Sequence, residues 1–428
     1  MLPDDAGHLI DFALRFELDQ ANDGARERAR LIVLDTYGAM LAAASHPIGV
    51  IAHRQALRTQ ALNEASLAGH DQRTGMLEAA FANGILANAV DFDEGSHVAT
   101  VALPAALAMA EKMSLSGKDF LTAFIVAFEI ASRLREALAP ALGQRGVWHI
   151  GHIGPLAAAL CGAHLLGLDA QTARMALGIA TAASAGYRRH LGTMTKALHS
   201  GHAARAGLEA ALLARDGFTA DADVFDANDG WLAALTTPQA PKREALRDLL
   251  AGPLVLDQPT KIKTMPVCTP IAPAIDAMIT CAARHGIAAS DIAHLAVDLK
   301  SGSLIRDRPI DLDAAPFSGR FLIALAAVRG AVSLDTLNHD TLVDQEIIHL
   351  MDRIDDAPGA TSIKIALKDG RSFEAPLGPV RRLKARDEIV AKFRACAAPR
   401  WTEARIATFV DKALAIETLA DINQLWSR

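Results

Sequence analysis

The sequence predicts a mainly α-helical protein in which a large all-helical domain is joined to a smaller α+β domain. Over residues 1 to about 250, apolar residues recur at helical spacing and alanine fills long stretches, as in closely packed helices. Beyond this point five prolines break the pattern, and strand-like alternation follows. We therefore expect a helical domain over 1–254 and an α+β domain over 255–390. Helical periodicity then returns, so the helices of 391–428 are candidates for a return to the first domain.

The helices expected in the first domain are marked by a proline near the first residue, a capping side chain, or a glycine after the last residue. Pro104 is expected to begin the first of them, Asp169 to cap the fourth, and Gly217 to close the last. They cover residues 105–113, 119–138, 154–167, 170–185 and 195–216.

The strand signals lie in the second domain. Apolar and polar residues alternate over 294–300 and again over 362–374. The dipeptide Asp369-Gly370 interrupts the second stretch and favours the two-residue turn of a β-hairpin. We therefore expect at least one antiparallel hairpin in the α+β domain.

Composition and charge exclude several classes of protein. The net charge is −6, acids and bases are mixed along the chain, and aromatic residues make up only 5%, which argues against a nucleic-acid surface. The longest apolar stretches contain Glu129 or His164 and are too short to span a bilayer. The acidic N-terminus lacks the basic region of a signal peptide, and the four cysteines form no CxxC motif. We expect a soluble, cytoplasmic protein with reduced thiols that binds neither nucleic acid nor membrane.

The first polar cluster is the stretch DFDEGSH at residues 91–97, between two expected helices. Its histidine can act as a general base, and a nearby carboxylate can fix the orientation or charge state of that histidine. The alternative is a solvated loop in which the acids cap helix ends. Spacing alone does not choose between the two.

The second cluster contains His149 and His152, in a glycine-rich stretch just before an expected buried helix. Because glycine permits a close approach of the backbone, these histidines could face a pocket, or they could be ordinary loop residues. A metal site needs three or four ligands, and no nearby cysteine completes a zinc set. We therefore predict no bound metal.

The third cluster is Lys196, His199 and His202, which lie along one face of an expected helix with a drift of about 60° per step. The rest of this helix is mostly alanine, glycine and leucine, so Lys196 is expected to be buried. A buried lysine is costly unless it meets an anion. That anion is an internal carboxylate or a substrate carboxylate, and we prefer the second.

The fourth cluster is Lys261, Lys263 and Cys268, before an expected helix near the domain junction. Lysines at a helix start suit anion binding, and the alternative is a polar surface linker. No Walker loop, GxGxxG fingerprint, HExxH motif or GxSxG elbow occurs in a suitable context. These features favour acid–base chemistry without a bound cofactor.

Taken in order, the clusters resemble the motifs of the MmgE/PrpD family. Residues 88–93 resemble its H-A-x-D-[FY]-D-D stretch, residues 97–104 match the histidine and second proline of H-P-x-x-x-x-x-P-A, and residues 148–149 resemble G-[FW]-H. Residues 195–204 match T-K-x-x-H-x-G-x-A-A closely, and residues 263–268 resemble K-x-x-P-x-[CH]. The resemblance covers most of the chain.

This resemblance implies a helical domain, a smaller α+β lid domain, a homodimer, and an active site in the cleft between the domains. The catalytic residues that it implies are Asp91, His97, His149, Lys196 and Lys263. The substrate-binding residues that it implies are Ser96, His199, Cys268, Ser318 and Arg320.

The chain departs from the family pattern in four places, one of which is a turn after His149 that is one residue shorter than in relatives. The loop over 93–97 is shorter than in familiar relatives, so Gly95 or Ser96 stands in for their threonine, and Val98 replaces their proline. Phe321 stands where several relatives have tyrosine, and its side chain cannot donate a proton. The general acid is therefore not identified by the resemblance.

By the resemblance, we expect a cofactor-independent lyase that acts on a small di- or tricarboxylate, with a dehydratase of the 2-methylcitrate type preferred over a decarboxylase or epimerase. His97 would exchange the proton, His149 would assist, and Lys196 and Lys263 would hold carboxylates. Two other classes stay open. The acids of 91–94 could hold Mg²⁺ in an isoprenoid-type synthase, or the chain could be a catalytically inactive binding protein.

Overall fold

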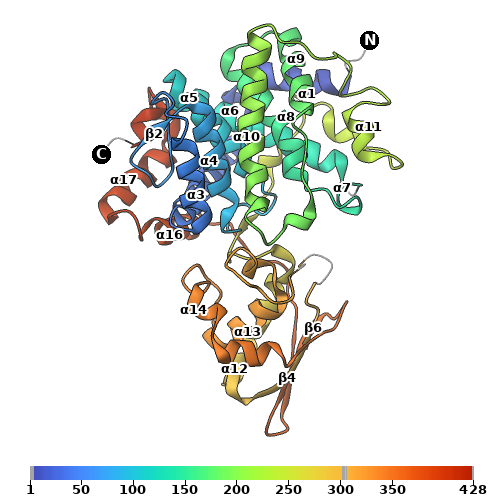
Figure 1. The fold of residues 1–428 in the computed structure, drawn as a ribbon, viewed down its shortest axis with the longest axis vertical. Helices are drawn as coiled ribbons and strands as arrows, with labels where there is room; N and C mark the ends of the chain where they lie inside the picture. The colour runs from blue at the N-terminus through green and yellow to red at the C-terminus, as the bar shows by residue number, and fades with distance from the viewer. Residues whose placement is uncertain (1–3, 140, 301–303, 305, 427–428) are drawn as a thin grey trace.

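The computed structural model describes residues 4–139, 141–300, 304 and 306–426. They form a mainly α-helical molecule with a large helical domain and a smaller α+β domain, as the sequence predicts (Figure 1). The helices of the first domain are α1 (Asp5–Arg15), α2 (Asp23–Ala43), α3 (Pro47–Leu57), α4 (Met76–Ala89), α5 (Ala99–Met113), α6 (Gly117–Leu138), α7 (Ala141–Gln144), α8 (His149–Leu166), α9 (Ala170–Thr181), α10 (Thr195–Arg215) and α11 (Trp231–Thr236).

The centre of the helical domain is the packing of α10 against α4 and α8. Small residues let these helices approach closely. A side chain at Gly84 in α4 would lie only 2.8 Å from the Cα atom of Gly201 in α10. This contact holds the end of α4 beside the start of α10, where the polar residues Asn88 and Lys196 lie.

Three of the predicted helices match α6, α9 and α10, and Asp169 caps α9 by accepting a hydrogen bond from the backbone N–H of Thr172. The prediction for Pro104 is wrong. This proline lies inside α5, which begins five positions earlier at Ala99.

The turn predicted around His149 and His152 is also wrong, because both residues belong to the first turns of α8. The helix includes Pro155, whose nitrogen has no hydrogen to donate to the carbonyl of Gly151. That carbonyl instead accepts a hydrogen bond from the backbone N–H of Ala185 at 3.0 Å. The helix can therefore begin before the proline without leaving the Gly151 carbonyl unpaired.

The small domain is built on a four-stranded sheet with the order β5–β4–β6–β7. Strand β5 runs parallel to β4, and the other pairs are antiparallel. Helix α12 packs on β6 and β7, and α13 packs on α12 and α15. The elements of this domain are α12 (Ala272–His285), β4 (Ile292–Val297), α13 (Gly319–Arg329), α14 (His339–Leu342), α15 (Gln345–Met351), β5 (Ile354–Asp356), β6 (Ser362–Leu367) and β7 (Ser372–Pro376).

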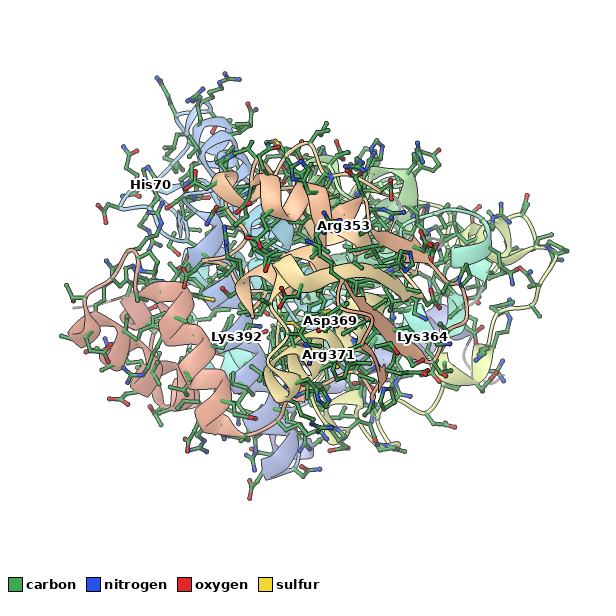
Figure 2. The ribbon with its side chains drawn as sticks, turned by 90° about the horizontal axis from the view of Figure 1, so that it is seen from below. His70, Arg353, Lys364, Asp369, Arg371 and Lys392 are labelled. Carbon is green, nitrogen blue, oxygen red and sulfur yellow. The ribbon has the colours of Figure 1, made fainter. Side chains whose placement is uncertain are left out.

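Both strand predictions for this domain are confirmed. The alternation near residue 294 is β4, and the predicted hairpin is the pair β6–β7. Figure 2 views the molecule from the small-domain side and labels Asp369 and Arg371 at the hairpin turn, where Nε of Arg371 lies 2.7 Å from Oδ2 of Asp369.

The chain enters and leaves the small domain at one place. Strand β3 (Ile262–Lys263), on the way in, pairs antiparallel with β8 (Arg382–Leu383), on the way out. Helices α16 (Arg386–Ala397) and α17 (Glu403–Leu414) then pack on α2, and Phe393 and Phe409 belong to the core of the helical domain. Both ends of the chain therefore build this domain, as Figure 1 shows.

Within the described part of the chain, no single helix combines the length and the hydropathy needed to cross a membrane. Helices α2 and α3 reach those values only when taken together, and they are bent by 94° relative to each other.

Candidate active site

The loop between α4 and α5 carries the first polar cluster of the sequence. Asp91 and His97, at its two ends, have positive φ angles of 49° and 65°. This left-handed conformation is unfavourable for side chains other than glycine and is retained where the surroundings require it. Here it lets both side chains turn inward, and Asp91, Asp93 and His97 are all buried. The alternative of a solvated loop is therefore wrong.

Asp91 joins two lysines that are far apart in the sequence. Its Oδ1 atom lies 2.5 Å from Nζ of Lys196, and its Oδ2 atom lies 2.8 Å from Nζ of Lys263. All three side chains are almost fully buried. Burial alone would raise the pKa of Asp91, but the two ammonium groups outweigh burial and hold that pKa far below its ordinary range. The internal carboxylate that the sequence leaves open as a partner of Lys196 is therefore present.

Residues from both domains surround Lys196. Nζ of Lys196 also donates to Oδ1 of Asn88 at 2.5 Å, and the ring of Phe317, which precedes α13, lies 5.5 Å from Nζ. The amide of Asn88 is held in turn by Ser200, at 2.8 Å. Asp91 and its two lysines therefore lie where the helical domain meets the small domain. Lys263 and Phe317 come from the side of the small domain.

His97 carries the free nitrogen of the site. Its Nδ1 lies 2.8 Å from Oδ2 of Asp93, and its Nε2 lies 3.8 Å from Oδ1 of Asp91. Because a carboxylate accepts hydrogen bonds, the Asp93 contact places the proton of the neutral ring on Nδ1 and leaves the lone pair on Nε2. Burial is the main cause that lowers the pKa of His97, with Asp93 opposing it and the two lysines adding to it. The ring is therefore neutral at neutral pH.

His149 lies beside the charged group of Asp91, His97, Lys196 and Lys263, and is not part of it. Its ring centroid is 6.5 Å from that of His97, and its Nε2 donates a hydrogen bond to the carbonyl of Ser96 at 3.0 Å. Burial, with a smaller contribution from the charge of Arg135, lowers the pKa of His149 to about 3. The Ser96 hydroxyl donates to Glu94 at 2.5 Å. Ser96 is therefore committed to the shape of its own loop.

Lys392 is a further buried cation that the sequence-based prediction lacks. From α16 it donates to the carbonyls of Phe92 and Lys263, and its Nζ lies 2.7 Å from Oδ1 of Asp35. It therefore holds β3 and the loop between α4 and α5 against the C-terminal helices. Its sequence signal is the spacing of Ile389, Lys392, Phe393 and Cys396, which places this lysine on the apolar face of its helix.

The structure does not bring all the predicted binding residues to the cluster. The Ser318 hydroxyl caps α13 and donates to the carbonyl of Asp307, and the Arg320 side chain donates to Asp307 and to the carbonyl of Ile354. Phe321 is buried in the core of the small domain. The polar atoms of Ser318 and Arg320 are therefore engaged within that domain.

The three residues of α10 that the sequence groups together, Lys196, His199 and His202, do not all reach the charged group around Asp91. His199 packs against Gly186, and its Nδ1 lies 3.2 Å from the carbonyl of Lys196. His202 is exposed and lies against Phe81. The predicted drift of about 60° per step therefore takes the helix from a buried Lys196 to an exposed His202.

Cys268 is half-buried near the charged group. Burial raises the pKa of its thiol to about 11, with the Asp91 carboxylate adding to the effect and Lys263 opposing it. The thiol is therefore protonated at neutral pH and is available as a neutral contact for a ligand.

Asp91, Asp93 and His97 offer ligand atoms within 4.8 Å of one another, which is close enough to share a metal ion. However, both oxygens of Asp91 bind lysine ammonium groups, and Asp93 binds the ring of His97. Two ammonium ions at these distances oppose a bound cation. The arrangement suits proton transfer near an anion better than metal binding.

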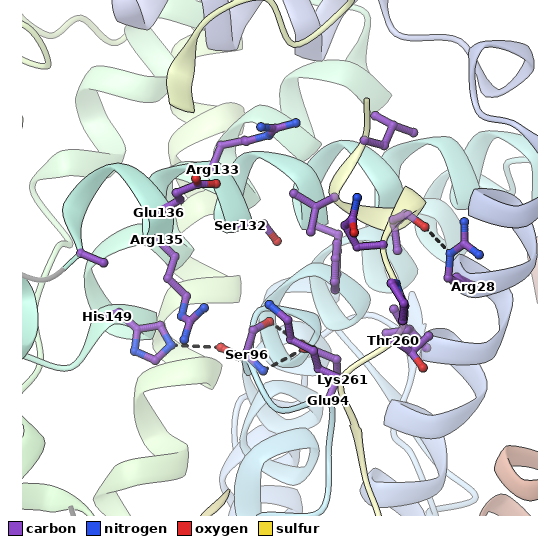
Figure 3. A pocket seen from close by; sticks show the side chains of 18 of the residues that line it. Arg28, Glu94, Ser96, Ser132, Arg133, Arg135, Glu136, His149, Thr260 and Lys261 are labelled. Atoms are coloured by element: carbon purple, nitrogen blue, oxygen red, sulfur yellow. Dashed lines mark hydrogen bonds between the residues drawn. The ribbon is translucent and has the colours of Figure 1, made fainter. Parts of the chain in front are cut away.

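A cavity of about 910 Å³ opens next to the cluster, on the other side of Ser96 and His149. Figure 3 shows it between the end of α6, the start of α8 and the segment 253–261.

Two models of known protein domains together match nearly the whole chain. The model of the MmgE/PrpD N-terminal domain matches residues 7–244, and that of the MmgE/PrpD C-terminal domain matches residues 265–415. The C-terminal match includes all of α16 and α17, although these helices pack in the core of the helical domain.

Several curated proteins are similar over most of their length. A cis-aconitate decarboxylase of Aspergillus terreus is 25% identical over 97% of this chain and 94% of its own. The cis-aconitate decarboxylase-like protein oryM of Aspergillus oryzae is 29% identical over 84% of this chain and 83% of its own. The cis-aconitate decarboxylase of Homo sapiens is 24% identical over 94% of this chain and 90% of its own.

Proposed function

Because the chain belongs to the MmgE/PrpD family, we propose that it is a lyase that acts on a small di- or tricarboxylate by exchanging a proton between His97 and a carbon next to a carboxylate group. The observation that carries this proposal is the pair of ammonium groups of Lys196 and Lys263 beside the free Nε2 of His97. Positive groups fixed in a buried site offset the negative charge that develops when such a carbon gains or loses a proton.

Decarboxylation is the first candidate, because the similar proteins are named cis-aconitate decarboxylases. In this step the bond to one carboxylate breaks, CO₂ leaves, and the electron pair moves into the conjugated system of a remaining carboxylate. Lys196 and Lys263 would stabilise that charge, and protonated His97 would deliver the proton to carbon. A polyanionic substrate beside the ring raises the pKa of His97 and so favours the protonated form.

Dehydration is the second candidate, and it is the one preferred from the sequence alone. The neutral His97 of the unliganded protein favours it, because the free Nε2 can remove a proton from carbon. Dehydration also requires an acid for the departing hydroxyl group. Neither tyrosine offers an obvious one, since Tyr37 is buried against Phe409 and Tyr187 is largely exposed.

The test is a substrate panel of cis-aconitate, citrate, 2-methylcitrate and iminodisuccinate, with products read by mass spectrometry. Loss of CO₂ identifies decarboxylation, loss of water identifies dehydration, and uptake of solvent deuterium without another change identifies epimerisation. If the folded protein converts none of these compounds, the proposal is wrong, and the binding-protein alternative gains support.

The pH dependence of kcat separates the two roles of His97. A histidine that donates a proton loses activity as the pH rises through its pKa in the complex. A histidine that removes a proton loses activity as the pH falls through that pKa. The direction of the limb therefore distinguishes decarboxylation from dehydration independently of the product analysis.

The magnesium-dependent synthase is a weaker alternative, because the lysine partners of Asp91 occupy the oxygens that would bind the ion. A requirement for Mg²⁺ in turnover would favour it. The family also suggests a homodimer, which we propose for this chain and which light scattering coupled to size-exclusion chromatography would test.

A further inference from the structure

The cavity of about 910 Å³ beside the cluster has a predominantly basic lining. It is walled by Ser96 and His149 on the side of the charged group. Its acidic residues are Glu94 and Glu136, and its basic residues are Arg28, Arg133, Arg135, Lys242 and Lys261. The cavity therefore carries an excess of positive charge in a protein whose net charge is −6.

Two of these cations are already committed. The Arg28 side chain donates to the carbonyl of Leu256, and the Arg133 side chain binds Glu129 at 2.7 Å and the carbonyl of Pro253 at 2.6 Å. They therefore hold the segment that closes one side of the cavity.

Arg135, Lys242 and Lys261 are different. Within the part of the chain that the structure describes, none of these three side chains makes a hydrogen bond or an ion pair, and Arg135 and Lys261 are the two that lie near Ser96 and His149. Arg135 is half-buried, and its charge is the second cause, after burial, of the lowered pKa of His149. Figure 3 shows Arg135 beside His149 and Ser96, with Lys261 facing the same space from the opposite wall. A partly buried guanidinium group without a partner is suited to an anion from outside the protein.

We propose that Arg135 and Lys261 bind a carboxylate group of the substrate that does not react. This inference rests on the proposed function and extends it to specificity. His149 lines the cavity, and its ring centroid lies 6.5 Å from that of His97 at the reacting centre. A tricarboxylate has a carboxylate for the cavity in addition to those near Lys196 and Lys263. A shorter dicarboxylate cannot make that contact, so Arg135 and Lys261 favour the binding of tricarboxylates.

The direct test uses tricarballylate, a saturated tricarboxylate with no hydroxyl group or double bond, so that binding is measured without turnover. Calorimetric titration of Arg135→Gln and Lys261→Gln should show affinity roughly 10- to 100-fold below that of the unmodified protein, as expected for loss of a charge-assisted hydrogen bond. Binding of succinate, which is shorter and lacks the third carboxylate, should change little. Arg135→Lys should retain part of the affinity.

Arg58→Gln is the matched control, since Arg58 is exposed at the end of α3, donates to Gln55 and does not line the cavity. Affinities for tricarballylate within about twofold of the unmodified protein in both cavity variants would overturn this inference, and so would an equal loss for succinate. If the unmodified protein converts a polycarboxylate and the cavity variants keep its KM, this inference fails alone. If the protein neither converts nor binds any polycarboxylate, the proposed function fails with it.

Discussion

Asp93 and His97 are four residues apart in the chain, and the Asp93 carboxylate accepts a hydrogen bond from Nδ1 of the His97 ring at 2.8 Å. One short loop therefore holds both the imidazole and the group that orients it. The orientation leaves Nε2 towards Asp91 and its two lysines.

Asp93→Asn should show Asp93 to be a positioning residue. The negative charge of Asp93 raises the pKa of His97, so its removal should lower that pKa further. The limb of the pH profile of kcat/KM that reports His97 should move to lower pH, and turnover should fall roughly 100-fold because the ring tautomer is no longer fixed. Asp11→Asn, which alters only an exposed ion pair with Arg15, is the control. An unshifted profile would remove Asp93 from this role.

His97→Asn should reduce turnover by roughly 10²–10⁴, the usual contribution of a general acid or base. Asparagine tolerates the positive φ angle at this position, so the thermal unfolding midpoint should change little. His202→Asn makes the same substitution on the exposed side of α10 and should leave the rate unchanged. Full activity in the His97 variant would contradict the proposed proton transfer.

Asp91→Asn should be strongly destabilising. It leaves two buried ammonium groups without their carboxylate, so the free energy of unfolding should fall by about 3–5 kcal/mol in urea titrations. Because the folded protein lowers the pKa of Asp91, its contribution is complete above the ordinary value of 3.8 and is lost as the pH falls below it. The two proteins should therefore converge in stability in acid. Asp216→Asn, at an exposed position, should match the unmodified protein throughout.

Phe321→Tyr should not supply the missing acid. Phe321 is 1% exposed in the apolar core of the small domain, so an added hydroxyl group would be buried without a partner. The free energy of unfolding should fall by about 1–3 kcal/mol, with kcat unchanged. Phe218→Tyr, at an exposed position, is the control. An increase in kcat for the Phe321 variant would place this side chain in the active site after all.

The charged residues could be predicted because they stand out in apolar surroundings. Lys196 lies in a helix rich in alanine, glycine and leucine, so its burial and its need for an anion follow from the sequence. The identity of that anion could not be predicted in the same way. Asp91 is 105 residues away and is brought to Lys196 by the packing of α4 on α10.

Other errors have local causes. Pro104 and Pro155 resemble helix starts, but both lie inside helices, and in α8 the freed carbonyl finds another donor. Ser318 and Arg320 lie in a segment that resembles the family's lid. Their side chains bind backbone carbonyls that only the folded small domain places near them.

Because α16 and α17 pack in the helical domain, they affect where a chimeric protein can be joined from two relatives. Lys392 belongs to the last tenth of the chain, yet it holds the backbone of the loop near Asp91 through the carbonyl of Phe92. A hybrid that took everything after residue 264 from another protein would replace this tether together with the small domain. The boundary between the two domains is at the paired strands β3 and β8. A domain exchange limited to residues 264–381 would therefore keep the recipient's own Lys392 and its contact with Phe92.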